Sequence, residues 1–410
     1  MRIVRDREAW SAPPAGRRDE VAEILAEVRR RGDDAVLDYT ERFDKAELGP
    51  GELRVDPREL EGSIGVLEPD LLRALETAIR NVRAVAEAQL HPPVPVDLPE
   101  GQRVDLAELP VARVGVYVPA GRAPYPSTVV MCAVTARVAG VTQIAVCAPP
   151  GPGGRAHPLI LAACVLCEVN EVYRMGGAQA IAALAYGTQS VRAVDLIVGP
   201  GNAWVTEAKR QVFGQVGIDG LAGPSELVVI AGPDADPELV ALDLLAQAEH
   251  GPDSPVELIA LDEAVLGAVV EAIERLAPAR PSVTDAELGV RRVADVQAAL
   301  RAAEELAPEH LQLVGREVEA LADRVRSAGC VFVGPAAGTA FGDYVAGSNH
   351  VLPTGRAARF QSALSPATFR RRMARVSLPG EAPGRLAPAG AALARAEGFP
   401  VHAESMERRA

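Results

Sequence analysis

The stretch RVGVYVPAGRAPYPSTVVMCAVTARVAGVTQIAVCA (residues 113–148) consists of two short apolar runs with a longer apolar segment between them. The runs, 113–119 and 142–148, are rich in β-branched residues and have the length of buried strands. The segment between them begins near Ser127 and has the length of a helix. Strand, helix and strand in this order form a βαβ unit, in which parallel strands are covered by helices on both faces. The stretch therefore predicts an α/β fold.

The same alternation continues along the chain and then starts again. Two such series predict an α/β fold with two doubly wound, incomplete Rossmann-like domains that contain parallel sheets. In the first series, further strands are expected at 171–175 and 194–199, and helices begin near His157 and Ala178. In the second, strands are expected at 226–232, 256–262, 311–315 and 330–334, with helices near 236–250, 263–276, 293–306 and 317–327.

Segments of different character flank the two series. Apolar residues recur at helical spacing over 18–90, and the Pro-rich 91–101 is typical of a linker or extended arm. The last forty residues are rich in Ala, Pro and Gly and too few for a core of their own, so they should pack on something else, another subunit being one candidate. The expected organisation is an N-terminal arm (1–17), a helical segment that packs with the second α/β domain (18–101), a first Rossmann-like domain (102–224), a second one (225–364) and a C-terminal tail domain (365–410).

Composition excludes several classes of protein. Of the 410 residues, 48% are hydrophobic and 24% charged, which is typical of a globular protein rather than a disordered one. The net charge of −13 argues against binding to nucleic acid or to an anionic membrane surface. The N-terminus has no signal-peptide pattern and no apolar run is long enough to span a bilayer, so we expect a cytoplasmic protein. The five cysteines include Cys164 and Cys167 in a C-x-x-C, but these lie in an apolar helix and are expected to be core thiols.

Glycine-rich turns follow three strands of the first series. They are PAGRAP, MGGAQA and VGPGNAW, and ligands of doubly wound sheets bind at the carboxyl ends of strands. None is a G-x-G-x-x-G with an acidic residue about 20 positions later, so the standard dinucleotide fingerprint is absent. By themselves these turns could equally be plain connections.

Histidines are scarce, and four of the six stand near carboxylates or carboxamides. Of these four, His250 follows Gln247 by three residues, so both side chains share one helix face and could bind one zinc ion. Asp343 lies in a turn-rich loop, where it could be a third ligand. The alternative is that each histidine is a core or surface residue satisfied by a neighbouring carboxylate.

Glu309 and His310 are adjacent and follow Pro308. A carboxylate and an imidazole that titrates near neutral pH could act as general acid and base. Because adjacent residues point in different directions, we expect them to act in separate steps. The alternative is a solvated Glu-His pair at the end of a helix.

Together these stretches closely resemble the histidinol dehydrogenase family, whose members carry out the last two oxidations of histidine biosynthesis. The matching segments occur in the family's order from about residue 20 to the end of the chain. Small departures are Ala120, where the family has glycine, and Trp204, where phenylalanine is usual. The segments are VGVYVPAGRAPYPSTVVM, MGGAQAIAALAYGT, VGPGNAWVTEAKRQV, GLAGPSELVVIA, LLAQAEHGPDS, APEHLQL, GDYVAGSNHVLPTG and EGFPVHA.

The resemblance implies a role for individual residues. The implied zinc ligands are Gln247, His250, Asp343 and His402, which would also contact the substrate. Glu309 and His310 match the acid/base pair, of which His310 also meets the substrate. Further substrate contacts match Ser225, His350 and Glu397, and cofactor contacts match Tyr117, Gln179 and Asn202.

The implied reaction is a four-electron oxidation of L-histidinol to L-histidine through L-histidinaldehyde, with two NAD, water and Zn²⁺. The family also implies a homodimer in which the tail of one subunit completes the partner's site. Three alternatives stay open: a paralogous zinc- and NAD-dependent dehydrogenase of another polar alcohol, a zinc hydrolase in which Glu309 activates water, and a non-catalytic structural zinc protein.

Overall fold

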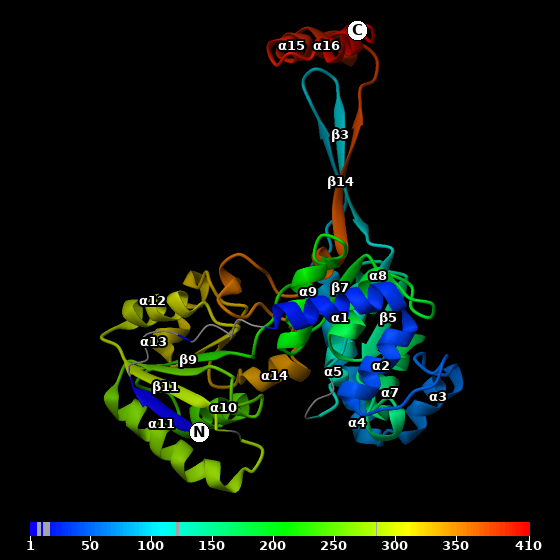
Figure 1. Cartoon of the computed structure of the whole chain (residues 1–410). Coiled ribbons are helices and arrows are strands. Elements are labelled where there is room, and N and C mark those ends of the chain that lie inside the picture. Colours follow the sequence, from blue (N-terminus) through cyan, green and yellow to red (C-terminus); the bar gives the residue numbers. More distant parts are fainter. Residues whose placement is uncertain (6–9, 11–16, 120–122, 284) are drawn as a thin grey trace.

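The computed structural model describes residues 1–5, 10, 17–119, 123–283 and 285–410, so Ala120 lies outside the described residues. It contains two parallel sheets, each with helices on both faces, and a long antiparallel arm (Figure 1). The predicted α/β class with two doubly wound parallel sheets is therefore confirmed. Among the described residues no helix combines the length and the apolar character needed to cross a bilayer.

The first sheet has the strand order β6-β5-β4-β7-β8, and all its neighbours are parallel. The chain adds β5 and β6 on one side of β4 and then returns to add β7 and β8 on the other. The gap between the β4 and β7 connections is the switch point at which such sheets bind ligands. The strands are β4 (Arg113–Tyr117), β5 (Gln143–Ala148), β6 (Glu171–Arg174), β7 (Leu196–Val198) and β8 (Gly217–Ile218). The helices are α5 (Pro126–Val129), α6 (Thr135–Val138), α7 (Pro158–Leu166), α8 (Gly177–Tyr186) and α9 (Ala203–Val212), with a π-turn at Val130–Val134 between α5 and α6.

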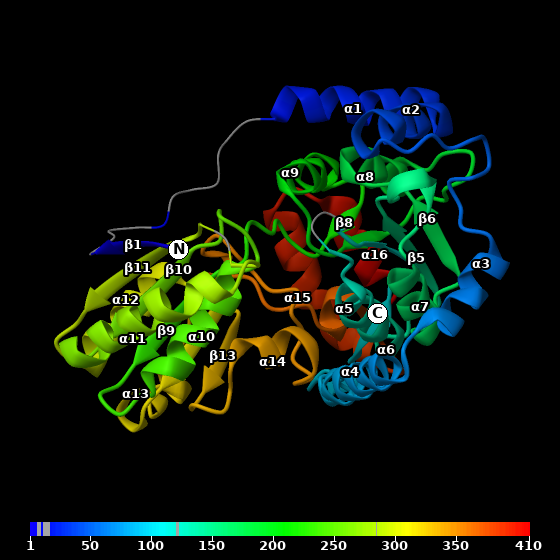
Figure 2. The same cartoon turned by 90° about the horizontal axis from the view of Figure 1, so that it is seen from below.

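The N-terminal helices pack on this first sheet, so the prediction that 18–101 packs with the second α/β domain is wrong. Helices α1 (Arg18–Arg31) and α2 (Asp33–Asp44) lie against α8 and α9, whereas α3 (Pro57–Gly62) and α4 (Pro69–Ala88) lie against α7 and α6 (Figure 2). Their apolar faces complete two cores, one on each side of the sheet. Helical spacing identifies the apolar face of a helix but not the surface that covers it, which explains the error.

The second sheet has the order β1-β11-β10-β9-β12-β13 and is also parallel. The expected N-terminal arm (1–17) begins as edge strand β1 of this sheet, beside β11. Helices α10 and α11 cover one face, and α12 covers the other. The strands are β1 (Arg2–Arg5), β9 (Leu227–Ala231), β10 (Val256–Ala260), β11 (Glu287–Arg292), β12 (His310–Val314) and β13 (Cys330–Val333). The helices are α10 (Pro237–Ala248), α11 (Glu263–Leu276), α12 (Val296–Leu306), α13 (Arg316–Glu319) and α14 (Thr339–Tyr344).

A three-stranded antiparallel arm projects from the body of the protein. It pairs β2 (Val94–Asp97) and β14 (Arg370–Ser377) with the two edges of β3 (Arg103–Pro110). At its far end, helices α15 (Ala382–Ala396) and α16 (Pro400–Glu407) pack on each other around a small alanine cluster. Figure 1 shows this helical pair well away from both parallel sheets.

The cysteines are free thiols, as expected from their number. Cys164 and Cys167 belong to the core between the first sheet and helices α3 and α4. Burial raises the pKa of Cys167 to about 12 and that of Cys164 well above its ordinary value. Both thiols are therefore protonated at neutral pH, which fits a packing role rather than a redox or metal role.

Candidate active site

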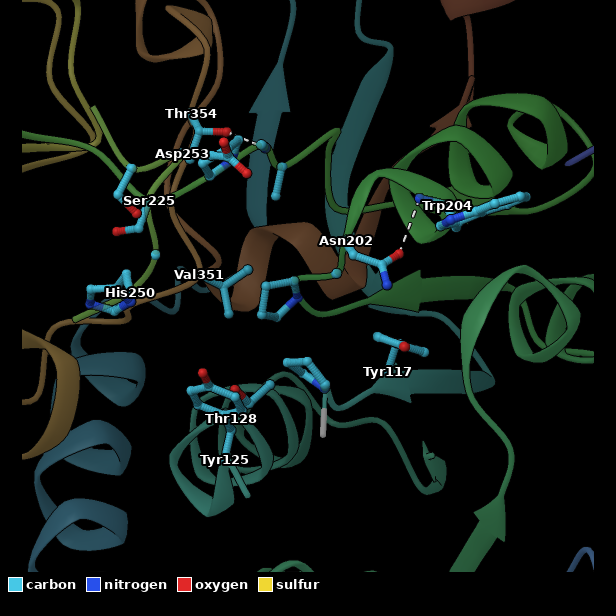
Figure 3. A pocket seen from close by; sticks show the side chains of 18 of the residues that line it. Tyr117, Tyr125, Thr128, Asn202, Trp204, Ser225, His250, Asp253, Val351 and Thr354 are labelled. Atoms are coloured by element: carbon cyan, nitrogen blue, oxygen red, sulfur yellow. Dashed lines mark hydrogen bonds between the residues drawn. The ribbon is translucent and has the colours of Figure 1, made fainter. Parts of the chain in front are cut away.

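A cleft of about 680 Å³ lies between the two α/β domains and collects most of the residues singled out in the sequence. One end of the cleft is lined by carboxyl and imidazole side chains, and the other by glycine turns of the first domain. Figure 3 shows Ser225 and His250 at one end and Tyr117 and Asn202 at the other, with Thr128 along one wall. The predicted residues that line it are Tyr117, Gln179, Asn202, Ser225, His250, Glu309, His310, Asp343 and His350.

The two sheets present opposite ends of their strands to this cleft. Tyr117 ends β4, and the turns after β6 and β7 also line it, so the first sheet contributes carboxyl ends. Ser225 lies just before β9, and Glu309 just before β12, so the second sheet contributes amino ends. The backbone N–H groups of residues just before a strand lie outside the ladder and are available to bind carboxyl groups.

The carboxyl groups of Glu309 and Glu226 each accept a hydrogen bond from the backbone N–H of the other residue. Glu226 was not singled out in the sequence. The backbone N–H of Glu226 donates to Glu309 Oε2 at 2.9 Å, and that of Glu309 donates to Glu226 Oε2 at 3.2 Å. Ser225 Oγ donates to Glu309 Oε2 at 2.6 Å, and the Gly355 N–H donates to Glu226 Oε1 at 2.7 Å. Burial raises the pKa of Glu226 to about 8, so this carboxyl carries a proton at neutral pH. A signal for Glu226 existed, because it is an acidic residue directly before the wholly apolar strand β9.

His310 lies within reach of both neighbouring carboxylates. Its Nδ1 is 3.0 Å from the backbone oxygen of Glu226 and 3.4 Å from Glu309 Oε2, and its Nε2 is 3.7 Å from Asp343 Oδ1. Burial acts to lower the pKa of His310, but the charges of Glu309 and Asp343 outweigh it and raise the pKa to about 9. The expectation that Glu309 and His310 point in different directions is wrong, because Glu309 precedes the strand and its carboxylate turns back toward the ring.

The predicted zinc ligands are only partly assembled within one chain. His250 Nε2 is 3.9 Å from Asp343 Oδ2, and the buried Gln247 donates its amide N–H to Ser225 Oγ at 2.9 Å. Two ligands of one tetrahedral zinc, each about 2.1 Å from the ion, lie about 3.4 Å apart, so the His250–Asp343 spacing fits such an ion after a small adjustment. Within the described part of the chain, no group of three or more His, Cys, Asp or Glu side chains is placed to hold a metal.

Glu397 and His402 are not in the cleft of their own chain. Both are exposed on the helical pair at the far end of the arm. The ring of His402 lies against Phe399, with 5.3 Å between the ring centroids. The four predicted ligands are therefore not brought together within one chain.

His350 and Asn349 join the two domains across the cleft. His350 Nδ1 lies 2.8 Å from the backbone oxygen of Asp343, and its Nε2 lies 3.5 Å from Thr128 Oγ1 of the first domain. Burial lowers the pKa of His350 and keeps the ring neutral. Asn349 Nδ2 donates to the backbone oxygen of Met131 at 3.0 Å, within the π-turn. The same Met131 oxygen also accepts a hydrogen bond from Thr135 Oγ1 at 2.6 Å. No sequence pattern marked Asn349 for this contact.

At the other end of the cleft, the predicted cofactor residues surround the glycine turns. Tyr117 Oη accepts a hydrogen bond from the Gly177 N–H at 3.2 Å, and burial raises the pKa of this phenol. Asn202 Oδ1 accepts from the Trp204 N–H at 3.0 Å and caps α9. The Gln179 side chain is 1% exposed, and neither polar atom of its amide has a hydrogen-bond partner among the described residues. Such an amide in a cleft is placed to meet a polar ligand.

Two doubly wound domains that face each other across a cleft with a carboxylate–imidazole cluster define a two-domain α/β enzyme. The sequence profile of histidinol dehydrogenase matches residues 12–410. The chain belongs to the histidinol dehydrogenase family, and it is therefore an oxidoreductase.

Individual relatives agree with this assignment. The histidinol dehydrogenase of Gluconobacter oxydans is 44% identical over 95% of this chain and 92% of its own length. The histidinol dehydrogenase of Ruegeria pomeroyi is 46% identical over 95% of this chain and 91% of its own length. A crystal structure of histidinol dehydrogenase from Elizabethkingia anophelis superimposes with a TM-score of 0.94 at 31% identity and covers 100% of this chain and 98% of its own.

Proposed function

We propose that this protein oxidises L-histidinol to L-histidine through L-histidinaldehyde, with two NAD, water and a bound zinc ion. The observation that carries the proposal is the Glu309–His310–Asp343 cluster, which faces the glycine turns of the first domain across one cleft. The family of the chain supports the substrate. The free cysteines support the cytoplasm as the compartment, because thiols stay reduced there.

The residues present fit both implied groups. For NAD, the cleft offers glycine turns at strand carboxyl ends and the Gln179 amide, which has no hydrogen-bond partner among the described residues, with Tyr117 and Asn202 also lining the cleft. NAD would accept the hydride of each oxidation. For zinc, His250 and Asp343 face each other at a suitable spacing, and the Gln247 amide N–H is taken by Ser225, which leaves its carbonyl oxygen for a ligand. Zinc would supply Lewis-acid chemistry and orient the substrate.

His310 is the residue we assign to proton removal from the carbinol. Its Nδ1–H is held by the backbone oxygen of Glu226, which leaves Nε2 as the basic nitrogen on the cleft side. Because the neighbouring carboxylates raise its pKa to about 9, His310 is mostly an imidazolium at neutral pH, and its neutral fraction, which grows toward pH 9, is the base. The same carboxylates stabilise the imidazolium that forms when this fraction accepts the proton.

Glu309 is the residue we assign to water activation in the aldehyde-to-acid half. Its carboxylate is fixed by Ser225 and by the Glu226 N–H, while Glu226 itself is kept neutral by burial. A neutral Glu226 can serve as a structural hydrogen-bond partner, which leaves Glu309 for the role of base. His350, neutral and fixed by the Asp343 backbone, and Ser225 are proposed to contact the substrate.

We further propose a homodimer in which Glu397 and His402 of one subunit reach the cleft of the other. Their exposure at the end of a projecting arm supports this, since side chains with such roles would have no ligand in their own chain. His402→Ala and Glu309→Gln chains should each fail to form histidine, which is the activity measured here. When the two are refolded together, about a quarter of the wild-type sites should recover, because a hybrid dimer has one site with both defects and one with neither. No recovery would contradict the shared site.

The overall proposal is tested with zinc-loaded protein, L-histidinol and NAD, by following NADH absorbance and histidine formation. We expect two NADH per histidine. No NADH from histidinol, together with turnover of another polar alcohol, would instead identify a paralogous dehydrogenase. No NADH from any alcohol would favour the hydrolase alternative.

A further inference from the structure

Asp44 places a carboxylate at the cofactor end of the cleft, although it belongs to the N-terminal helical layer. It is the last residue of α2 and lines the cleft beside Pro149 and Gly176. A Cβ atom added to Gly176 would lie 2.5 Å from Pro149 Cγ and 3.3 Å from Asp44 Oδ1, so these three residues are packed together. The carboxylate thus reaches the turns that follow β5 and β6.

The environment of Asp44 does not stabilise a negative charge. Its Oδ2 atom is buried and has no hydrogen-bond partner in the described part of the chain. Burial raises its pKa to about 6, and a carboxylate at the last residue of a helix also faces the negative end of the helix dipole. Packing alone therefore gives no reason for an acidic residue here, whereas a ligand that donates hydrogen bonds would.

Gln179 provides a second, independent indication of a ligand at this place. Its buried amide is unpartnered among the residues described, and its Oε1 would lie 2.7 Å from a Cβ atom on Gly177, the glycine next to Gly176. One acceptor and one amide thus flank the same turn with their hydrogen-bonding capacity unused. Neighbouring hydroxyl groups, such as those of a ribose, match this arrangement because each can both donate and accept.

The place of Asp44 at the end of β5 indicates which of the two riboses of NAD would lie beside it. In doubly wound dinucleotide-binding domains, an acidic residue about 20 positions after the glycine turn binds the ribose 2′-hydroxyl of the adenosine half. Here β4 and β5 are the first two strands, but β5 is followed by Pro149 and Pro150 and has no acidic residue at its end. Asp44 supplies a carboxylate to this place from a different segment of the chain.

An aromatic surface lies next to Asp44, as an adenine subsite requires. Phe43 is 42% exposed and lines the cleft together with Trp204, with 6.1 Å between their ring centroids. A purine can stack on such side chains. The cleft therefore has an aromatic part, then a carboxylate, then the glycine turns.

We propose that Asp44 accepts hydrogen bonds from the adenosine ribose of NAD and makes the enzyme select NAD over NADP. The inference rests on the proposed function, since it specifies the cofactor end of the same site. The 2′-phosphate of NADP would place about two negative charges against the Asp44 carboxylate in a partly buried site, which is unfavourable.

The test compares wild type with Asp44→Asn and Asp44→Ser. Asp44→Asn keeps the size of the side chain and removes a buried charge, so the fold should be retained, which thermal melting will verify. Glu41→Gln is the matched control, because Glu41 is an exposed carboxylate on the same helix and does not line the cleft. The readouts are steady-state kinetics with NAD and NADP, and calorimetric binding of ADP-ribose and 2′-phospho-ADP-ribose.

For both variants we expect KM for NAD to rise about tenfold to a hundredfold, the effect of losing charge-assisted hydrogen bonds. We expect kcat to change less than about twofold, because the ribose is remote from the hydride. ADP-ribose should bind more weakly and its 2′-phospho derivative no more weakly than to wild type. An unchanged preference between the two ligands, or an equal loss of both, would overturn the role of Asp44. The binding readout does not need histidinol turnover, so a wild type that prefers ADP-ribose but is inactive on histidinol would refute the proposed substrate and leave Asp44 supported.

Discussion

Substituting Lys209 by methionine should destabilise the protein strongly, because it would leave a buried carboxylate without its cation. Lys209 Nζ, on α9, donates to the Asp219 carboxylate and, at 3.0 Å, to the backbone oxygen of Gly199. Asp219 Oδ2 accepts from the Gly199 N–H at 2.7 Å. The two side chains are 3% and 7% exposed, so water cannot replace the lost ammonium. Removing one partner of a buried ion pair costs about 3–5 kcal/mol.

The substitution also removes the hydrogen bond from Lys209 to Gly199, in the turn that lines the cofactor end of the cleft. Gly199 has a φ of 110°, and its N–H and C=O are both held by the ion pair. The next residues of the turn, including Asn202, line the cleft. We therefore expect KM for NAD to increase in Lys209→Met, with a smaller change in kcat.

Urea unfolding is followed by tryptophan fluorescence, to which Trp10 and Trp204 contribute, Trp204 lying on the same helix as Lys209. Arg210→Met is the matched control, because Arg210 is 44% exposed and its ion pair with Glu207 should contribute no more than about 1 kcal/mol. The double variant Lys209→Met/Asp219→Asn should recover at least half of the loss, since no charge is then left buried. A loss below about 1 kcal/mol in Lys209→Met, or no recovery in the double variant, would refute the reasoning.

Three further predictions concern the opposite end of the cleft. The folded-state pKa of Glu226 is raised from 4.5 to about 8, so its contribution to stability is fully present below pH 4.5 and is lost as the pH rises through 8. In Glu226→Gln the melting temperature should therefore fall less between about pH 5 and 8 than in wild type. A dependence of the melting temperature on pH equal to that of wild type would contradict this prediction. Asn349→Ala should cost about 1 kcal/mol in urea unfolding and raise KM for histidinol more than KM for NAD, whereas equal changes in both would contradict a role in holding His350. Chelation should abolish turnover reversibly and leave the far-ultraviolet circular dichroism largely unchanged; if the dichroism is lost in parallel, the metal is structural.

The buried strands were predictable because each is a nearly continuous apolar run covered on both faces. All eight expected strands form, from β4 (Arg113–Tyr117) to β13 (Cys330–Val333). Strand β11 was missed because only part of its sequence, ELGVRR, is apolar, and its last residue is exposed. The arm strands were missed for a related reason. β14 reads RRRMARVS and no helix layer covers it, so neither the apolar run nor the alternation of a half-buried strand is present.

The site was predictable as a set of residues but not as a geometry. Family resemblance and residue chemistry named Ser225, Glu309 and His310, which the structure brings together. Neither the resemblance nor the residue chemistry could identify Glu226. Its importance comes from its pairing with Glu309, which is 83 residues away in the chain and lies at the start of a neighbouring strand. Neither could place Asp44, because only the folded helical layer brings the end of α2 to the end of β5.

The paired amino ends of β9 and β12 explain how one site can place two glutamates side by side in different surroundings. Each carboxyl group accepts the backbone N–H of the other residue, so the backbone fixes both in position. Two buried carboxylates at this spacing cannot both ionise cheaply. Burial raises the pKa of Glu226 to about 8, whereas the carboxyl group of Glu309 faces His310 and the Ser225 hydroxyl. The same pairing aims the backbone oxygen of Glu226 at His310 Nδ1 and thereby turns Nε2 toward the cleft. A single backbone arrangement thus fixes both the position of the proposed base for water and the orientation of the proposed base for the carbinol.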